Sequence, residues 1–227
     1  FYVRGSTFSV DYSSPVTGIM FPVNLSTRSA VGYISGTSID EPQGAAYVRA
    51  GVTAVKLRVQ RLTADSSTYW DGGGWNTNEV WISTSPGWQY SLMPPWAHNV
   101  RYVISAYALD GIGNQETAFT LGVSTISVLF DLQRPTATVL SPVPGGYMNG
   151  DQTAISGTAD DVPADIRSLQ IALSSSSTGV GNSWWNGSAF TDAFSDAVYQ
   201  ATSAYTNNPA GTSDTWSMTR PGNVYMD

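Results

Sequence analysis

The sequence of 227 residues lacks cysteine and holds a single lysine and a single histidine. Without cysteine, the chain has no disulfides, no thiolate metal site and no cysteine nucleophile. A net charge of −7 leaves no basic patch to neutralise phosphates, so we expect neither nucleic acid nor anionic lipid as a partner. No apolar run approaches the roughly 18 residues that span a bilayer, so we expect no membrane insertion.

The composition indicates a folded all-β protein. Hydrophobic residues make up 41% of the chain and charged residues 12%, with 8 Trp and 12 Tyr. Disordered chains have the opposite composition, rich in charge and poor in aromatic residues. Runs of helix-forming residues are almost absent, whereas β-branched and aromatic residues abound. The length suits two domains of about 100 residues each.

Four stretches of the sequence recur in the same order. The pairs are DYSSPVTGIMFP and DLQRPTATVLSP (11–22 and 131–142), YISGTSID and AISGTADD (33–40 and 154–161), TYWDGGGW and SWWNGSAF (68–75 and 183–190), and GWQYSLMPP and TWSMTRPG (87–95 and 215–222). Their spacing indicates a tandem repeat of roughly 120 residues, with insertions in the loops.

Strands are clearest where apolar and polar residues alternate. Residues 52–62 place Val55, Leu57 and Val59 on one face, and residues 100–110 alternate in the same way. This period of two predicts antiparallel sheets with one wet face. We expect further strands near 16–22, 30–37, 79–84, 87–92 and 117–122. Seven strands in about 110 residues predict an immunoglobulin-like β-sandwich, repeated in tandem.

The ordered motifs resemble the bacterial immunoglobulin-like tandem repeats of large secreted surface and adhesin-type proteins. They are a proline-led strand after an aspartate, I-S-G-T-x-x-D, an aromatic-W-(D/N)-G turn, a tryptophan-led strand and D-x-x-G-N. The resemblance implies an extracellular, cell-surface protein that is a spacer or adhesive segment of a fibre, stalk or appendage. Its partners would be copies of itself or neighbouring repeats. It implies no chemistry of the chain's own.

The repeat pattern divides the chain into residues 1–12, a first domain at 13–131 and a second at 132–227, which lacks its final strands. Residues 1–12 match the last strand of a preceding unit, because GSTFSVDYSSP resembles STISVLFDLQRP at 124–135. One interpretation, which we favour, is a piece cut from a longer chain. The other is strand donation to the next subunit, which builds a filament. The donated side chains would be Val3, Phe8 and Val10.

Acidic loop residues form a candidate calcium site, although the sequence requires no cofactor. Calcium takes about six to eight oxygen ligands, and such sites stiffen repeat arrays at their junctions. Aspartate and asparagine also form ordinary turns, and we favour that explanation. For catalysis, the sequence offers only one loop histidine and none of the common catalytic motifs, so we expect no enzyme. The candidate calcium ligands are Asp40, Glu41, Asp110, Asn114 and Asp131.

The tryptophan-rich hairpins raise the alternative of a carbohydrate-binding module. Exposed indoles stack on sugar rings, which would make surface glycans a partner. The same residues also suit a hairpin in which Trp70 and Trp81 cover the core and Trp75 caps the tip. Because both repeats carry the motif at the same place, we favour this structural role. The tryptophans concerned are Trp70, Trp75, Trp81, Trp184 and Trp185.

Overall fold

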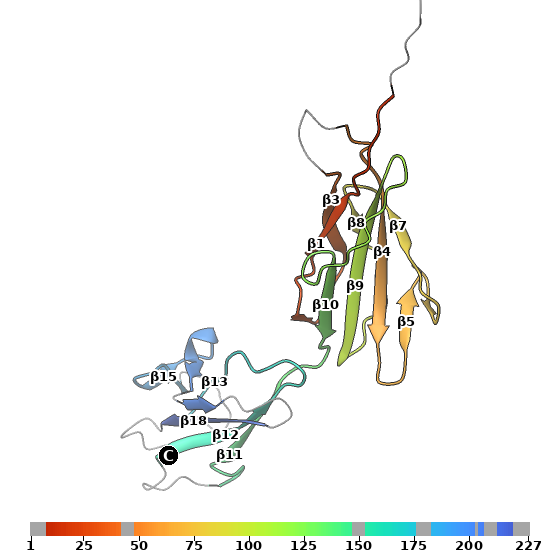
Figure 1. Ribbon diagram of the computed structural model, residues 1–227. Coiled ribbons are helices and arrows are strands. Elements are labelled where there is room, and N and C mark those ends of the chain that lie inside the picture. Colours follow the sequence, from red (N-terminus) through yellow and green to blue (C-terminus); the bar gives the residue numbers. More distant parts are fainter. Residues whose placement is uncertain are drawn as a thin grey trace, which may run out of the picture. The chain divides into compact units, whose positions relative to one another are not determined.

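The computed structural model shows an all-β protein with two compact units, Phe1–Leu132 and Gln133–Asp227 (Figure 1). It describes residues 8–41, 48–146, 153–175, 183–202, 204–206 and 213–219. Within these ranges the helical structure amounts to one 3-10 turn, η1 (Asp196–Val198). None of the described helical structure is long and apolar enough to cross a membrane. The predicted all-β class is therefore confirmed.

Unit 1 consists of two sheets. The smaller has the strand order β1-β3-β8, and the larger has the order β2-β10-β9-β4-β5-β6, with β7 paired to β4. All neighbours are antiparallel except β2 and β10, which run parallel. The bounds are β1 (Val16–Phe21), β2 (Ser26–Arg28), β3 (Ile34–Ile39), β4 (Val52–Leu62), β5 (Ser67–Trp70), β6 (Trp75–Asn76), β7 (Ile82–Thr84), β8 (Gln89–Tyr90), β9 (Val100–Asp110) and β10 (Thr125–Phe130).

The core of unit 1 lies between these two sheets. The predicted alternation in β4 is confirmed, because Val55, Leu57 and Val59 are fully buried. They pack in one hydrophobic cluster with side chains of β9 and β10 and with Ile34 of β3 from the other sheet. Burying a side chain of this size contributes about 1.5–3 kcal/mol, so this interior is the main source of stability. Unit 1 is thus a sandwich of two packed sheets (Figure 1).

One strand predicted near the end of unit 1 does not form. We expected a strand at 117–122, but the last strand of unit 1 is β10 at Thr125–Phe130, within the stretch 124–135 that the repeat alignment assigns to the end of a repeat. The chain turns before it, because the N–H groups of residues 123, 124 and 125 all donate to the carbonyl oxygen of Thr120. Gly122 supplies the positive φ of 83° in this turn. Ile126, Val128 and Phe130 then face the core at alternate positions.

Unit 2 has a four-stranded antiparallel sheet in the order β11-β12-β18-β17 and two short strand pairs, β13-β16 and β14-β15. Its described core is smaller and centres on Ile155 and Trp216. Of the motif TWSMTRPG at 215–222, the structure describes residues 215–219, which lie in β18, but not residues 220–222. The bounds are β11 (Thr136–Ser141), β12 (Ala154–Asp160), β13 (Gln170–Ile171), β14 (Trp184–Trp185), β15 (Phe190–Asp192), β16 (Gln200–Ala201), β17 (Ala204–Thr206) and β18 (Asp214–Thr219).

The two units share the details of one three-stranded motif. β1 pairs with β3 as β11 pairs with β12, and each pairing has an irregularity near the end of the first strand, between Ile19 and Phe21 or between Val139 and Ser141. Each first strand ends in a cis peptide bond to proline, at Pro22 and Pro142. Four of the other five strands of unit 2 also have counterparts in unit 1. β13 pairs with β16 as β4 pairs with β7, and β14 pairs with β15 as β5 pairs with β6.

Candidate metal site

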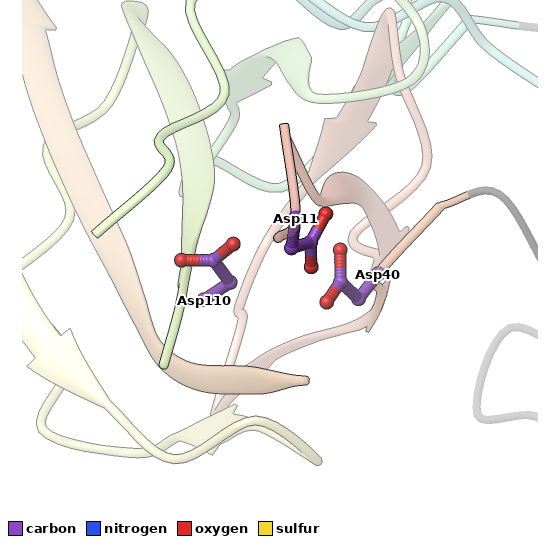
Figure 2. Close-up of side chains that lie close together, drawn as sticks. All are labelled: Asp11, Asp40 and Asp110. Atoms are coloured by element: carbon purple, nitrogen blue, oxygen red, sulfur yellow. The ribbon is translucent and has the colours of Figure 1, made fainter. Parts of the chain in front are cut away.

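Three buried aspartates lie together at one end of unit 1. Asp11 precedes β1, Asp40 follows β3 and Asp110 is the last residue of β9. Each offers a carboxylate oxygen within 4.8 Å of the others, and all three residues are at least nine-tenths buried. Figure 2 shows the three side chains gathered in one place, with Asp11 between the other two in that view. The fold therefore joins three segments that are far apart in the sequence.

Asp11 is held by the segment that follows it and by the loop before β4. Its Oδ1 accepts hydrogen bonds from the Ser13 hydroxyl and from the Ser13 N–H, and its Oδ2 accepts the Ala50 N–H at 2.7 Å. These bonds, led by that of the Ser13 hydroxyl, hold the pKa of the Asp11 carboxyl below its ordinary value of 3.8. The charge of Arg49 acts in the same direction. Asp11 is therefore ionised at neutral pH.

Asp40 and Asp110 are oriented by backbone groups. Oδ2 of Asp40 accepts the Gly51 N–H at 2.7 Å. Oδ1 of Asp110 accepts the N–H groups of Ile112 and Asn114, at 3.0 and 2.7 Å. The D-G-I-G-N sequence after β9 thus folds back onto its own first residue. These contacts fix where the carboxylates point before any ligand arrives.

Asn114 connects two of the three aspartates. Its side-chain Nδ2 donates to Oδ2 of Asp110 at 2.7 Å and to the backbone carbonyl of Asp11 at 3.2 Å. The predicted pair of Asp110 and Asn114 therefore does lie in the cluster. Asn114 contributes as a hydrogen-bond donor in this arrangement, which ties the chain before β1 to the loop after β9.

The predicted five-residue calcium set does not converge. Glu41 follows Asp40 in the chain but is not one of the three clustered carboxylates. Asp131 lies at the opposite end of unit 1, because β10 is antiparallel to β9 and Phe130 pairs with Val100, the first residue of β9. There, Asp131 approaches Nδ1 of the single histidine, His98, at 3.2 Å.

Sequence reasoning missed Asp11, although the signal was present. The repeat alignment places the aspartate of D-Y-S-S-P opposite that of D-L-Q-R-P, so Asp11 and Asp131 occupy the same repeat position. The prediction chose the right position in the repeat but took it from the wrong unit. An aspartate before the first strand of a sandwich belongs with the loops at that strand's own end.

Chemically, this arrangement suits a divalent cation. Negative charges that are gathered in a buried place repel one another, and an opposite charge between them lowers their energy. Carboxylate oxygens are the ligands that calcium prefers, and its flexible geometry accepts water and backbone carbonyls as the remaining ligands. Zinc and copper favour nitrogen and sulfur ligands. The described cluster contains neither histidine nor cysteine.

The aromatic hairpin of unit 1 forms as predicted, between β5 and β6. Trp70 pairs with Trp75, and Oδ1 of Asp71 accepts the N–H groups of Gly73 and Gly74 in the turn. The ring of Trp70 is buried, and its Nε1 donates to the carbonyl of Leu92 at 2.8 Å. This turn chemistry explains the W-D-G-G-G sequence.

The roles predicted for Trp75 and Trp81 are both wrong. Trp75 packs against the core instead of capping the tip, with its ring centroid 5.5 Å from that of Trp70 and 5.8 Å from that of Tyr102. Trp81 packs outside the core, edge-on to Tyr107 and stacked on Phe119. Arg58 lies 4.8 Å from the ring centroid of Trp81. Every one of these indoles thus has protein neighbours.

The hairpin of unit 2 follows the same plan. Trp185 is buried and pairs with Phe190, while Trp184 is half-buried beside Phe194. Asn186 takes the role of Asp71, because its Oδ1 accepts the N–H groups of Ser188 and Ala189. Of the predicted donated side chains, Phe8 and Val10 are exposed, and Val3 lies outside the described residues.

No protein-family model, curated protein or solved structure matches the chain.

Proposed function

We propose that this chain is a non-enzymatic structural segment of a bacterial extracellular fibre, stalk or adhesin that is built from immunoglobulin-like domains. The observation that carries the proposal is the shared motif of the two units, down to the strand irregularity and the glycine beneath a tryptophan. Repetition of one domain along a chain is how proteins build length and spacing. A repeated domain also needs no chemistry of its own.

The strand orders support the immunoglobulin-like assignment. In that fold, strands A, B, E and D form one sheet and C, F and G form the other. The sheet β11-β12-β18-β17 of unit 2 has the A-B-E-D order, and β4, β9 and β10 of unit 1 have the C-F-G order. The first three-stranded sheet of unit 1, β1-β3-β8, corresponds to A-B-E.

We further propose that Asp11, Asp40 and Asp110 bind calcium in this segment. Asp11 belongs to the chain that leads into β1, whereas Asp40 and Asp110 belong to the sandwich itself. A cation held between them would therefore fasten the incoming chain to the domain. Such fastening restricts bending where consecutive repeats meet, which suits a stalk that carries load.

The structural role is tested by locating the protein in its source cells. Antibodies raised against the full chain should label fibres or stalks outside the cell in immunogold electron micrographs. The same antibodies should detect the protein in the surface fraction. Labelling confined to the cell interior would contradict the proposal.

The calcium role is tested by titration of the full chain after treatment with a chelator. We expect a calorimetric binding signal and a rise in the melting temperature of unit 1, because a ligand at a hundred times its Kd stabilises the folded state by about 2.7 kcal/mol. Asp110→Asn and Asp40→Asn should each abolish this rise. The matched control is Asp65→Asn, which makes the same change at an exposed position. A wild-type chain that melts identically with calcium and with chelator would refute the calcium role.

A further inference from the structure

The single histidine of the chain lies where the chain leaves unit 1. His98 stands just before β9, and Asp131 and Leu132 directly follow β10. The antiparallel pairing of β9 with β10 places these two segments side by side, because Val100 pairs with Phe130. Leu132 is the last residue of unit 1. His98 therefore contacts the residues from which the chain continues into unit 2.

Two consecutive backbone N–H groups hold this end of unit 1. The Asp131 N–H donates to the carbonyl oxygen of Arg28 in β2 at 2.9 Å. The Leu132 N–H donates to Nδ1 of His98 at 3.2 Å. The first bond joins two backbone groups, which do not titrate. The second has a side-chain nitrogen as its acceptor, so it exists only while that nitrogen carries no proton.

Nδ1 of His98 faces two groups that require it in opposite states. The Leu132 N–H is a donor and needs the lone pair of Nδ1. Oδ1 of Asp131, which lies 3.2 Å from the same nitrogen, is an acceptor and needs a proton on it. A neutral imidazole donates through one nitrogen and accepts through the other, whereas both nitrogens of the charged form donate. The protonation state of His98 therefore decides which of the two bonds forms.

The surroundings of His98 favour a change from the first bond to the second in acid. Asp131 is buried, and a carboxylate forms a stronger hydrogen bond with a charged donor than with a neutral one. The His98 side chain is 28% exposed, so a proton reaches it from solvent. Histidine is the side chain whose charge ordinarily changes between about pH 5 and pH 8.

The other titratable and charged side chains on the strands packed here keep their charge over this range. Arg28 of β2 lies over the ring of Phe21, with 5.5 Å between its guanidinium carbon and the ring centroid. Arg101 of β9 donates to the Ser127 hydroxyl. Burial raises the pKa of the Tyr102 hydroxyl above its ordinary value of 10.0. None of these three groups therefore changes its charge between about pH 5 and pH 8.

We propose that His98 is a pH-sensitive fastening of the chain at its exit from unit 1. In the neutral form the ring proton is on Nε2, and Nδ1 accepts the Leu132 N–H. In the charged form Nδ1 donates to Oδ1 of Asp131, and the Leu132 N–H is released to water. The chain that leaves unit 1 is thus held one residue further at neutral pH than in mild acid. This switch does not depend on the proposed fibre role.

The experiment is nuclear magnetic resonance of the full isotope-labelled chain at about pH 8 and at about pH 5. At about pH 8, the nitrogen shifts of the imidazole should show a proton on Nε2 and none on Nδ1. The Leu132 amide should then exchange with water at least about fivefold more slowly than the same amide in an unfolded peptide at that pH, since one hydrogen bond contributes that much. At about pH 5 this protection should be lost.

Two variants at position 98 separate the switch from a purely structural role. His98→Asn places an amide oxygen near the position of Nδ1 and does not titrate, so the Leu132 amide should be protected at both pH values. His98→Phe keeps a ring without an acceptor, so this amide should be unprotected at both. The Asp131 amide, whose acceptor is a backbone carbonyl, is the internal control and should stay protected throughout. A proton on Nδ1 at about pH 8, or equal protection of the wild-type Leu132 amide at both pH values, would overturn the proposal.

Discussion

Gly36 of the I-S-G-T motif leaves no room for a side chain. A methyl group at this position would come closer than 3.0 Å to the carbonyl oxygen of Gly18 and to the indole of Trp88. Trp88 is fully buried, so its ring has no open space into which to move. Overpacking a core costs about 1–3 kcal/mol. Because a backbone group and a ring must both shift, we expect Gly36→Ala to lower the free energy of unfolding of unit 1 by about 3 kcal/mol.

The measurement is urea unfolding followed by hydrogen exchange of peptides from unit 1, which separates its transition from that of unit 2. Gly32→Ala is the control, because no atom lies within 4 Å of the position that its methyl would take. That change should be neutral or slightly stabilising, by at most about 1 kcal/mol, since it restricts the unfolded chain. A loss below about 1 kcal/mol for Gly36→Ala would show that the motif is not closely packed there.

Two further predictions concern the hairpin of unit 1. Hydrogen bonds, first from the Gly73 N–H and then from the Asn76 side chain, hold the pKa of Asp71 below its ordinary value of 3.8. The contribution of the Asp71 carboxylate to stability is therefore present above pH 3.8 and is lost as the pH falls through the lowered pKa. Asp71→Asn should flatten this part of the acid-unfolding profile. A profile unchanged by the substitution would contradict the assignment. Trp75→Ala should lower the free energy of unfolding by about 2 kcal/mol, because it removes packing against Trp70 and Tyr102. Glycan binding that this change abolishes without loss of stability would instead favour the carbohydrate-binding alternative.

The parts of the fold that the sequence predicted are those in which local pattern and burial agree. Alternation in 52–62 and 100–110 matches β4 and β9 because both strands have one face on the core and one toward solvent. The hairpin turn was predictable because Asp71 and its glycines satisfy the turn within a few residues. Neither inference needs knowledge of distant contacts.

The parts that it did not predict depend on distant contacts. Residues 117–122 alternate like a strand, but the three hydrogen bonds to the Thr120 carbonyl turn the chain before β10. Asp11 lies 29 positions before Asp40 in the sequence and still further from Asp110. The pairing of β1 with β3 brings it to Asp40, and Asp110 joins them from the end of β9 in the other sheet. Trp81 lies on the outer side because β7 pairs with β4 in a register that alternation alone does not fix.

The glycine of the I-S-G-T motif has a physical reason that the sequence pattern alone does not show. In unit 2, a methyl group on Gly157 would come closer than 3.0 Å to the Thr138 carbonyl oxygen and to the Trp216 ring, as at Gly36. In each unit, therefore, an indole lies directly on the backbone of the second strand, where no side chain fits; it comes from just before β8 in unit 1 and from β18 in unit 2. A hydrophobic residue in place of the glycine would keep the strand pattern and still break this contact. Both copies of the motif thus require an indole to lie close against the backbone. This requirement explains why the glycine and the tryptophan recur together while the loops around them differ in length.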